Sequence, residues 1–581
     1  MPLALRREVC VANIATVSPT NDPYVNGVLA GVKWTAETLS FSFPTNPGVY
    51  GQNYGYSENS AQFGHFNNVQ EQATRTILDF YASVADIHFV EINETFNQHA
   101  TLRFAESNAP STAWAYYPSQ GQLGGDVWLR HSLSLYNSPV KGNYGYTTLL
   151  HEIGHALGLK HPHEGEGYFH RMPHDYDSVE YSVMSYRSYV GASKGAYSNG
   201  TWSFPQTLMM YDIAAIQTLY GANYLTNSGD TTYHWDTSTG EFYINGEGQG
   251  TPIGNRVFMT LWDGGGRDTY DFSNYTTNLN IDLQPGGWSI ISAEQLASLA
   301  YQRYAHGNIA NALLYHNNPA SLIEDVIGGS GDDVIVGNIA DNTLTGGQGN
   351  DFLDGGIGAD TAAYSGSSLD YVWSQNEDNT WAIVDHRDGA PDGTDILKNI
   401  QYLDFTDLVV ALAQDDGSGD TGDTGPIAVD DFYATRSRTI TVDVLANDVD
   451  PNADTLSTIL VSGPARGNLS VDEDGHFVYT SPRHFKGKIS FSYAASDGSS
   501  ESEIATVQIK FGRHHRSPHK VGKGNDFDDT GSRHPASHFD HLERGHHDTH
   551  SIIYDQVPPT LGFEESAFNF ALTDESHWLF G

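Results

Sequence analysis

Four nine-residue units follow one another without a gap from Gly328 to Ala363, and they constrain the fold more than any other feature of the chain. The units read GGSGDDVIV, GNIADNTLT, GGQGNDFLD and GGIGADTAA. Each begins with a turn whose glycines let backbone carbonyls face an ion, and each ends in a short strand-forming triplet. The pattern predicts a parallel β-roll with calcium between its turns. The residues expected to point inward are Ile335, Leu344, Leu353 and Ala362.

The turns of these units supply the candidate calcium ligands. Carboxylates stacked at this density would repel one another in a dry fold, so we expect the roll to require the ion. The second unit has Asn338 and Ala340 where Gly is usual; carbonyl ligation tolerates the exchange, but the affinity of that turn stays open. The candidate ligands are Gly329, Gly331, Asp333, Asn338, Ala340, Asn342, Gly346, Gly347, Gly349, Asp351, Gly356, Gly358 and Asp360.

The net charge of the chain limits the classes of partner that it can bind. The 581 residues include 71 acidic and 29 basic ones, a formal net charge of −42, and 21 of the acids lie between residues 321 and 425. A surplus of this size excludes a nucleic-acid backbone as a partner and favours cations. Only Cys10 is present, so no intrachain disulfide can form and stability must come from packing or metals. No apolar run is long enough to span a membrane, and the N-terminus does not resemble a Sec signal.

The strongest chemical signal is the segment HEIGHALGLKH at residues 151–161. On a helix, His151 and His155 project from one face at a spacing that suits one tetrahedral Zn²⁺. Glu152 lies beside them and can act as a general base toward a metal-bound water. Gly158 permits the turn that ends the helix and brings His161 back as a third zinc ligand.

A second segment, Ser182-Val-Met-Ser-Tyr-Arg187, follows the zinc motif. The eleven-residue zinc pattern is the metzincin signature, and a turn containing Met belongs beneath the zinc in that clan. We therefore expect Met184 to form a hydrophobic floor and Tyr186 to lie within reach of the metal. His163, His170 and His174 have no ligand spacing and are expected on the surface or in the substrate cleft.

From about residue 20 to 410 the chain resembles the serralysins, secreted zinc proteases of the metzincin clan. The resemblance rests on the zinc motif, on Tyr24–Gly27 with Gly31–Trp34, on His161-Pro162, and on Gln206–Gln217. It implies that Tyr186 is a further zinc ligand that moves to stabilise the oxyanion, and that a peptide substrate adds as a strand at the edge Gly124–Leu129. It also implies calcium ligands at Asn227, Gly229, Thr231, Asp263, Gly265, Gly266, Asp268 and Glu324.

The expected architecture is multidomain. A leader or pro-segment (1–20) precedes an α/β metzincin protease domain (21–222), a parallel β-roll (223–414), a linker (415–426), a small Ig-like β-sandwich (427–511) and a disordered His-rich tail (512–581). Apolar spacing from Phe66 to Val84 predicts a long amphipathic helix, and a second helix is expected at 146–159. Strands are expected at 87–92, 101–105, 126–129, 439–444, 469–471, 476–480, 489–493 and 504–510.

Three features of the termini stay open. The oxygen-rich run from Asp443 to Asp454 in the cadherin-like sandwich is either a calcium site or a solvated acidic loop. The His-rich tail either chelates metal weakly or serves as a solubilising tail. Cys10 lies in the presumed leader, where a thiolate could cap the zinc as in matrix metalloproteases, although its flanking residues do not match the motif of those proteases.

These features predict a secreted, calcium-stabilised zinc endopeptidase (EC 3.4.24) made as a zymogen. The alternative is a calcium-dependent extracellular adhesin or matrix protein with a vestigial protease domain. The C-terminal end, Asp574 to Gly581, resembles a type I secretion signal. The expected partners are peptide substrates, the type I secretion machinery and a periplasmic protease inhibitor, and the expected state is a monomer.

Overall fold

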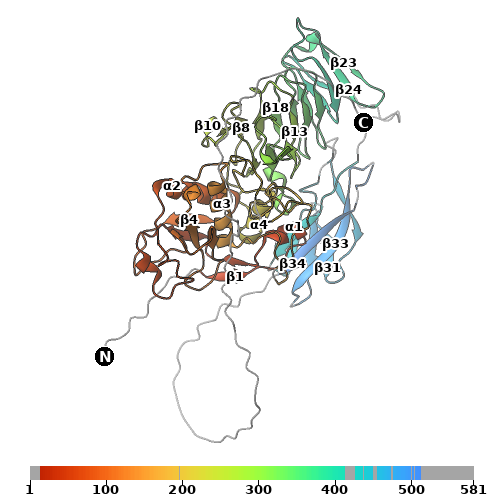
Figure 1. Cartoon of the computed structure of the whole chain (residues 1–581). Coiled ribbons are helices and arrows are strands. Elements are labelled where there is room, and N and C mark those ends of the chain that lie inside the picture. The colour runs from red at the N-terminus through yellow and green to blue at the C-terminus, as the bar shows by residue number, and fades with distance from the viewer. Residues whose placement is uncertain are drawn as a thin grey trace, which may run out of the picture.

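The computed structural model describes residues 13–165, 167–194, 197–412, 425–435, 437–448, 450, 455–472, 476–483, 485–498, 500–502 and 504–511. The expectations for Cys10, for most of the linker and for the His-rich tail lie outside these residues. The fold is mostly β-sheet with a few helices. Figure 1 shows the helices gathered at one end of a long stack of roll strands, with the sandwich as a body beside them.

The N-terminal part is a mixed sheet covered by helices. Its strands lie in the order β4 (His88–Glu91), β3 (Thr38–Ser42), β5 (Leu102–Ser107), β7 (Asp126–Arg130) and β6 (Ala113–Ala115). The helices are α1 (Pro23–Val28), α2 (Asn68–Val84), α3 (Tyr144–Leu157) and α4 (Met210–Tyr220), and 3-10 turns lie at Pro47–Tyr50 and Ser134–Tyr136. A capping box of Asn67 and Gln70 starts α2. The helix predicted from apolar spacing is confirmed, except that Val69 is 49% exposed.

Part of the expected leader is bound to this sheet domain. Strand β1 (Ile14–Thr16) pairs with β2 (Val32–Trp34) in antiparallel register, and the Val17 amide donates to Gly31 O at 2.9 Å. Sequence alone gave no signal for this pairing, because three-residue strands are too short to show a period.

The expectation that Gly124–Leu129 forms a free sheet edge is wrong. Strand β7 is paired on both sides, with β5 in parallel and with β6 in antiparallel register, as in Phe104↔Val127 and Trp114↔Trp128. The short antiparallel strand β6 is the edge strand on that side of the sheet. The sequence could not separate the two because Ala-Trp-Ala at 113–115 is too short to be recognised as a strand.

The roll is built from two sheets whose central strands are parallel and come from alternate repeats, with antiparallel strands at the ends of the sheets. One sheet runs β10 (Glu247–Gly248), β9 (Phe242–Ile244), β8 (Thr232–Trp235), β12 (Thr269–Asp271), β18 (Asp325–Ile327), β20 (Thr343–Thr345), β22 (Thr361–Ala363), β26 (Tyr402–Asp404), β27 (Val409–Ala411). The other runs β13 (Asn280–Asp282), β19 (Val334–Val336), β21 (Phe352–Asp354), β25 (Thr394–Lys398), β24 (Trp381–Asp385), β23 (Tyr371–Gln375). The inward residues of all four nonapeptides are fully buried, so this prediction is confirmed.

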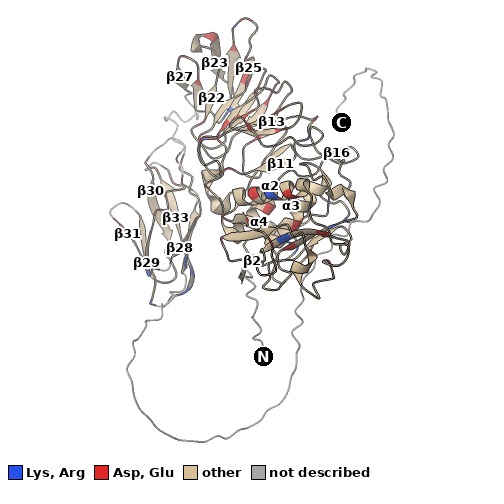
Figure 2. Ribbon diagram, turned by 90° about the vertical axis from the view of Figure 1, so that its left-hand side faces the viewer, with Lys and Arg blue, Asp and Glu red and all other residues tan. Residues whose placement is uncertain are grey.

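Smaller elements connect the roll to the helices. They are β11 (Met259–Leu261), β17 (Ile309–Asn311), β14 (Trp288–Ser289), β15 (Ser298–Ala300), β16 (Arg303–Tyr304) and 3-10 turns at Tyr315–Asn317, Pro319–Ser321 and Ser368–Asp370. Figure 2 shows acidic residues along the roll strands with few Lys and Arg between them. Among the described residues, no helix is both long and apolar enough to cross a membrane.

The C-terminal sandwich has two sheets. Their orders are β28 (Asp431–Thr435), β34 (Ala505–Phe511), β33 (Gly487–Ser496), β30 (Ser457–Ser462), and β29 (Thr439–Val442), β32 (Phe477–Thr480), β31 (Asn468–Val471). The predicted strands of this segment are present, and β28 and β30 were missed. Tyr479, Tyr493 and Val507 are fully buried in its core.

Candidate metal centre

Helix α3 ends at a glycine that no other residue could replace without strain. Gly158 has φ +111°, and a Cβ there would collide with the carbonyl oxygen of Val32. Its amide donates to His155 O at 3.0 Å and closes the last turn. The chain therefore reverses directly after α3, as the sequence predicted, and His161 returns toward the helix.

The three predicted zinc ligands come together. His161 Nε2 lies 3.1 Å from Nε2 of His151 and 3.1 Å from Nε2 of His155. All three side chains are at most 4% exposed. The rings of His151 and His155 are nearly perpendicular, so their nitrogens approach one point from different directions. This geometry suits the tetrahedral coordination of Zn²⁺.

Backbone carbonyls fix the tautomers of these histidines. His151 Nδ1 donates to Val183 O at 2.8 Å, and His155 Nδ1 donates to Leu159 O at 2.7 Å. Because a carbonyl can only accept, each Nδ1 carries the proton and each Nε2 presents a lone pair. One proton on His161 can satisfy only one of the two lone pairs. The cluster thus has an excess of acceptors, which a cation would resolve.

Burial disfavours the charged form of two of these histidines. It lowers the pKa of His155 and of His161 well below the ordinary value, and the neighbouring histidines add to both shifts. Neutral imidazole is the form that binds zinc. Glu164 Oε1 lies 3.2 Å from His161 Nδ1. The third histidine therefore has a carboxylate on its outer side, although the contact is not aligned as a hydrogen bond.

Glu152 and Tyr186 also lie at this centre. Glu152 follows His151 on α3 and is 1% exposed. The Tyr186 ring lies 4.2 Å from the His161 ring and 5.8 Å from the His151 ring, centroid to centroid. Met184 is fully buried, and a Cβ at Gly154 would come within 2.8 Å of its sulfur. The Met-containing turn therefore lies directly against α3, as expected.

A buried carboxylate on α4 holds this turn. Asp212 accepts from Ser182 Oγ at 2.6 Å and from the amides of Val183 and Met209 at 2.7 and 2.9 Å. Burial raises the pKa of Asp212 to about 7, and these hydrogen bonds oppose the shift. Since the Val183 carbonyl is the acceptor for His151, Asp212 supports the metal centre through one residue. No sequence pattern marks Asp212 for this role.

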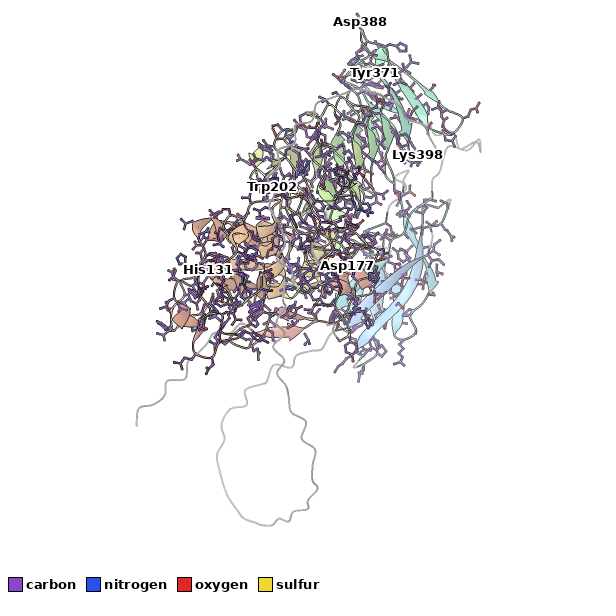
Figure 3. The ribbon with its side chains drawn as sticks, viewed as in Figure 1. His131, Asp177, Trp202, Tyr371, Asp388 and Lys398 are labelled. Carbon is purple, nitrogen blue, oxygen red and sulfur yellow. The ribbon has the colours of Figure 1, made fainter. Side chains whose placement is uncertain are left out.

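Asp177, labelled in Figure 3, holds the other end of the same turn. It accepts from Ser185 Oγ at 2.7 Å and from Arg187 Nε at 2.9 Å, and it is 1% exposed. This contact too was missed, because an Asp eight residues before a Ser carries no recognisable pattern.

Lys160 is a fully buried cation beside the third histidine. Its ammonium donates to the carbonyls of Gly27 at 2.5 Å and Glu164 at 2.7 Å. Three rotatable donors suit such a carbonyl cage. The side chain joins the loop after His161 to helix α1.

The other histidines behave differently from one another. The His163 ring stacks on that of His161 at 5.3 Å, and burial lowers the pKa of His163 to about 4. His161, His163 and Glu164 also approach one another closely enough to hold a metal. His170 and His174 are exposed, as expected. Tyr117, which the sequence analysis missed, meets the edge of the His155 ring at 5.7 Å.

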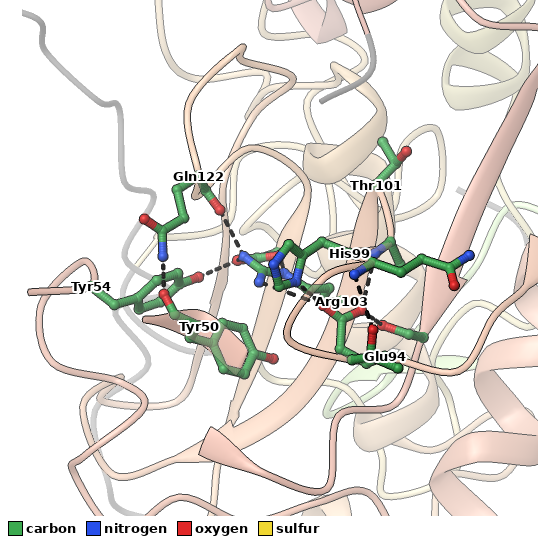
Figure 4. A network of polar contacts seen from close by, with 12 residues as sticks. Tyr50, Tyr54, Glu94, His99, Thr101, Arg103 and Gln122 are labelled. Atoms are coloured by element: carbon green, nitrogen blue, oxygen red, sulfur yellow. Dashed lines mark hydrogen bonds and ion pairs between the residues drawn. The ribbon is translucent and has the colours of Figure 1, made fainter. Parts of the chain in front are cut away.

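A buried ion pair supports the loop between β6 and β7, which carries Tyr117. Arg103 donates to Asp126 at 2.7 and 2.5 Å and to Gln122 O at 2.7 Å (Figure 4). Tyr54 donates to the same carboxylate, and Gln122 donates to Tyr50 O. Burial raises the pKa of Asp126 to about 6 against the effect of Arg103. The loop between β6 and β7 is thereby fixed to the sheet.

The calcium ligands expected around the start of the roll lie together. Asp268 accepts from the Thr231 amide, and Glu324 accepts from the Asp268 amide, each at 2.8 Å. Asp263 accepts from the Gly265 amide at 2.5 Å. Thr231 Oγ1 reaches the carbonyls of Asn227 and Gly229 at 3.1 and 2.6 Å, and a Cβ at Gly266 would lie 2.8 Å from Gly229 O.

These carboxylates are crowded without an ion. Burial raises the pKa of Asp263 to about 8 and that of Glu324 to about 7. Asp268 Oδ2 is buried without a hydrogen-bond partner. The oxygen-only surroundings match the preference of Ca²⁺.

Each of the first two nonapeptide turns contacts the turn that lies two repeats further along the chain. Asp333 N donates to Asp351 Oδ1, and Asn342 N donates to Asp360 Oδ1, each at 2.8 Å. The glycines of the third and fourth repeats lie so close to earlier backbone that an added Cβ would collide with a carbonyl oxygen. A Cβ at Gly347 would meet Gly329 O, one at Gly349 would meet Gly331 O, one at Gly356 would meet Asn338 O, and one at Gly358 would meet Ala340 O. Gly346 faces its own Asp351 in the same way. The predicted ligands are therefore brought together as two facing sets.

The second repeat differs from the others in its hydrogen bonding. Asn342 donates to Glu324 O at 2.9 Å and accepts from the Asn338 amide at 2.7 Å. Asn338 in turn donates to Ile323 O at 2.7 Å. By contrast, Asp351 Oδ2 and Asp360 Oδ2 are buried without hydrogen-bond partners. In the second repeat, the amide side chain of Asn342, which hydrogen-bonds within the roll, thus occupies the position where the later repeats have a buried carboxylate oxygen without a partner.

Two family models match segments of the chain between residues 222 and 510. Residues 222–417 match the serralysin C-terminal family of M10 peptidases, and residues 423–510 match a bacterial Ig domain. The chain is a relative of the serralysins. It is 33% identical over 317 residues to the metalloprotease AprA of Pseudomonas entomophila, covering 52% of this chain and 60% of AprA. A serralysin of Proteus mirabilis is 32% identical over 356 residues, covering 56% of this chain and 63% of the relative.

Serralysin B of Dickeya chrysanthemi is 36% identical over 289 residues, 47% of this chain and 54% of that protein. The chain thus spans between about half and two thirds of the length of these relatives. These matches agree with the resemblance that rests on the zinc motif and on three further stretches of the sequence.

Proposed function

We propose that the chain is a zinc endopeptidase that hydrolyses peptide bonds of extracellular proteins, with calcium stabilising its roll. The observation that carries the proposal is the convergence of three buried Nε2 atoms beside Glu152. The names of its relatives, metalloprotease and serralysin, support the same activity.

The roles of the residues follow from their chemistry. His151, His155 and His161 would hold Zn²⁺, which when bound supplies an acidic water and polarises the scissile carbonyl. Glu152 takes the proton of the attacking water and returns it to the leaving amine. Tyr186 donates its phenol proton to the oxygen on which negative charge develops. Asp212 and Asp177 keep the Met-containing turn in place beneath these groups.

Calcium belongs to the same proposal. The two facing ligand sets and the cluster of Asp263, Asp268 and Glu324 would bind Ca²⁺ through carboxylate and carbonyl oxygens. We also propose that the protein is exported by a type I secretion system and acts as an extracellular monomer. A roll that calcium stabilises would be much less stable in the cytosol, where calcium is scarce, than outside the cell. A periplasmic inhibitor of this centre is a further part of this proposal.

Metal-dependent cleavage of casein tests the activity. We expect the purified chain to lose cleavage in a zinc chelator and to regain it on adding Zn²⁺. His155→Ala should be inactive, while His174→Ala, which alters an exposed histidine, should cleave at the wild-type rate. A zinc-loaded wild-type chain that does not cleave would favour the alternative, an adhesin or matrix protein with a vestigial protease domain.

A further inference from the structure

The C-terminal sandwich encloses oxygen atoms that outnumber the donors facing them. Tyr493 Oη lies 2.7 Å from Val444 O, 3.2 Å from Val429 O and 2.9 Å from each carboxylate oxygen of Asp448. A phenol has one proton, so it can satisfy only one of these acceptors at a time. Asp448 Oδ1 also accepts from the Val429 amide at 2.8 Å, and the remaining oxygens around Tyr493 still leave these surroundings rich in lone pairs.

Two further oxygens near this point are buried without donors. Asp431 begins β28 and is 5% exposed; its Oδ1 accepts from the Tyr433 hydroxyl at 3.2 Å, but its Oδ2 has no hydrogen-bond partner. Asn447 uses its amide nitrogen to donate to Val429 O at 3.3 Å, and its Oδ1 is likewise buried without a partner.

The two carboxylates also affect each other. Burial raises the pKa of Asp431 to about 7, the Tyr493 and Tyr433 hydroxyls oppose the shift, and the charge of Asp448 adds to it. Burial raises the pKa of Asp448 to about 6. Two such groups near one phenol are unfavourable as anions unless a cation lies between them.

We propose that Asp431, Asn447 and Asp448 bind a calcium ion at this end of the sandwich. The candidate ligands are carboxylate, amide and carbonyl oxygens, a set that Ca²⁺ prefers and that contains none of the nitrogen or sulfur ligands of zinc. The ion would tie β28, the first strand of the sandwich, to the loop that follows β29. The inference does not depend on proteolysis or on the calcium sites of the roll.

The structure separates this site from Asp443, the first residue of the acidic run noticed in the sequence. Asp443 is exposed and its carboxylate faces His476 at 3.6 Å, so it lies outside the site. Asn452 and Asp454 lie outside the described residues. Asp431 lies twelve positions before Asp443, where that run begins. Sequence spacing therefore did not suggest Asp431 as a ligand.

Hydrogen–deuterium exchange on the full chain tests the proposal segment by segment. We expect Ca²⁺ added to the EGTA-treated protein to slow exchange in residues 427–448 and 487–496, and Mg²⁺ at the same concentration to do so much less. In Asp431→Asn the calcium concentration needed for this protection should rise at least about tenfold, while the response of residues 328–363 stays as in wild type. Glu501→Gln, an exposed carboxylate of the same sandwich, should respond as wild type.

The charge of the variant distinguishes lost binding from lost folding. Because Asp431→Asn removes one of two neighbouring anions, its exchange in EGTA should be no faster than that of wild type. If residues 427–448 and 487–496 of Asp431→Asn exchange faster than in wild type both in EGTA and in Ca²⁺, the variant is misfolded. Asp448→Asn would then be the deciding variant. Wild-type exchange in 427–448 that is identical with and without Ca²⁺, while the roll responds, would overturn the proposal.

Discussion

At the scale of single residues, Asp212 shows how a metal centre depends on a group that does not touch the metal. It binds the Val183 amide, and the Val183 carbonyl accepts the Nδ1 proton of His151. Outer hydrogen bonds of this kind orient the ligand ring and fix its tautomer. The zinc motif was readable from the sequence because its spacing is local, whereas the contact of Asp212 with residue 183 exists only after folding.

We therefore expect Asp212→Asn to weaken zinc binding. An amide presents one acceptor oxygen, and its NH₂ would face the amides of Val183 and Met209, which leaves a buried donor unsatisfied at a cost of about 1–3 kcal/mol. Zinc affinity should fall about 10- to 100-fold. A competition titration against a chelating dye measures it, with exposed Asp86→Asn as the matched control. Unchanged affinity in Asp212→Asn would show that the turn holds its shape without this carboxylate.

At the scale of elements, the nonapeptides were predictable in detail and the rest of the roll was not. The eighth position of each repeat is buried because parallel strands of adjacent coils place it on the inner face. After Ala363 the repeat stops, yet β25 still pairs in parallel with β21, and Asp395 accepts from the Asp351 amide at 2.9 Å. Because the hairpin β23–β24 lies between them in sequence, spacing could not reveal this coil.

Roll stability should depend on pH in opposite ways with and without calcium. Burial raises the pKa of Asp333 to about 6 and those of Asp351 and Asp360 to about 7, above the unfolded value of 3.8. In EGTA the unfolded chain releases these protons first, so stability falls as pH rises from about 4 to 7. With calcium bound the ionised form is the ligand, and the fall should disappear or reverse.

Melting temperatures measured across this range test the sign. Asp351→Asn should raise the melting temperature in EGTA, because it removes a buried charge, and should lower it in calcium. Asp388→Asn, at the exposed far end of the roll in Figure 3, should change neither. Stability in EGTA that rises between pH 4 and 7 would contradict the account.

At the scale of the whole molecule, the charge of −42 is distributed among parts that use it differently. In the roll and the sandwich, some carboxylate oxygens are buried without a hydrogen-bond partner, as at Asp351, Asp360 and Asp431. Near the metal centre both oxygens of Asp177 and of Asp212 accept hydrogen bonds, and these carboxyl groups hold a turn in place. The composition predicted metal dependence for the chain, but it could not show which carboxylates face a metal.

The most direct test of the central claim is Glu152→Gln. The substitution keeps the size of the side chain and removes only its capacity to take a proton. Zinc content by atomic absorption and casein hydrolysis should be measured on the same preparation, with exposed Glu37→Gln as control. The account predicts unchanged zinc and a loss of activity of at least about 100-fold, with the control like wild type. A zinc-loaded Glu152→Gln protein that cleaves casein at a rate near wild type would contradict it.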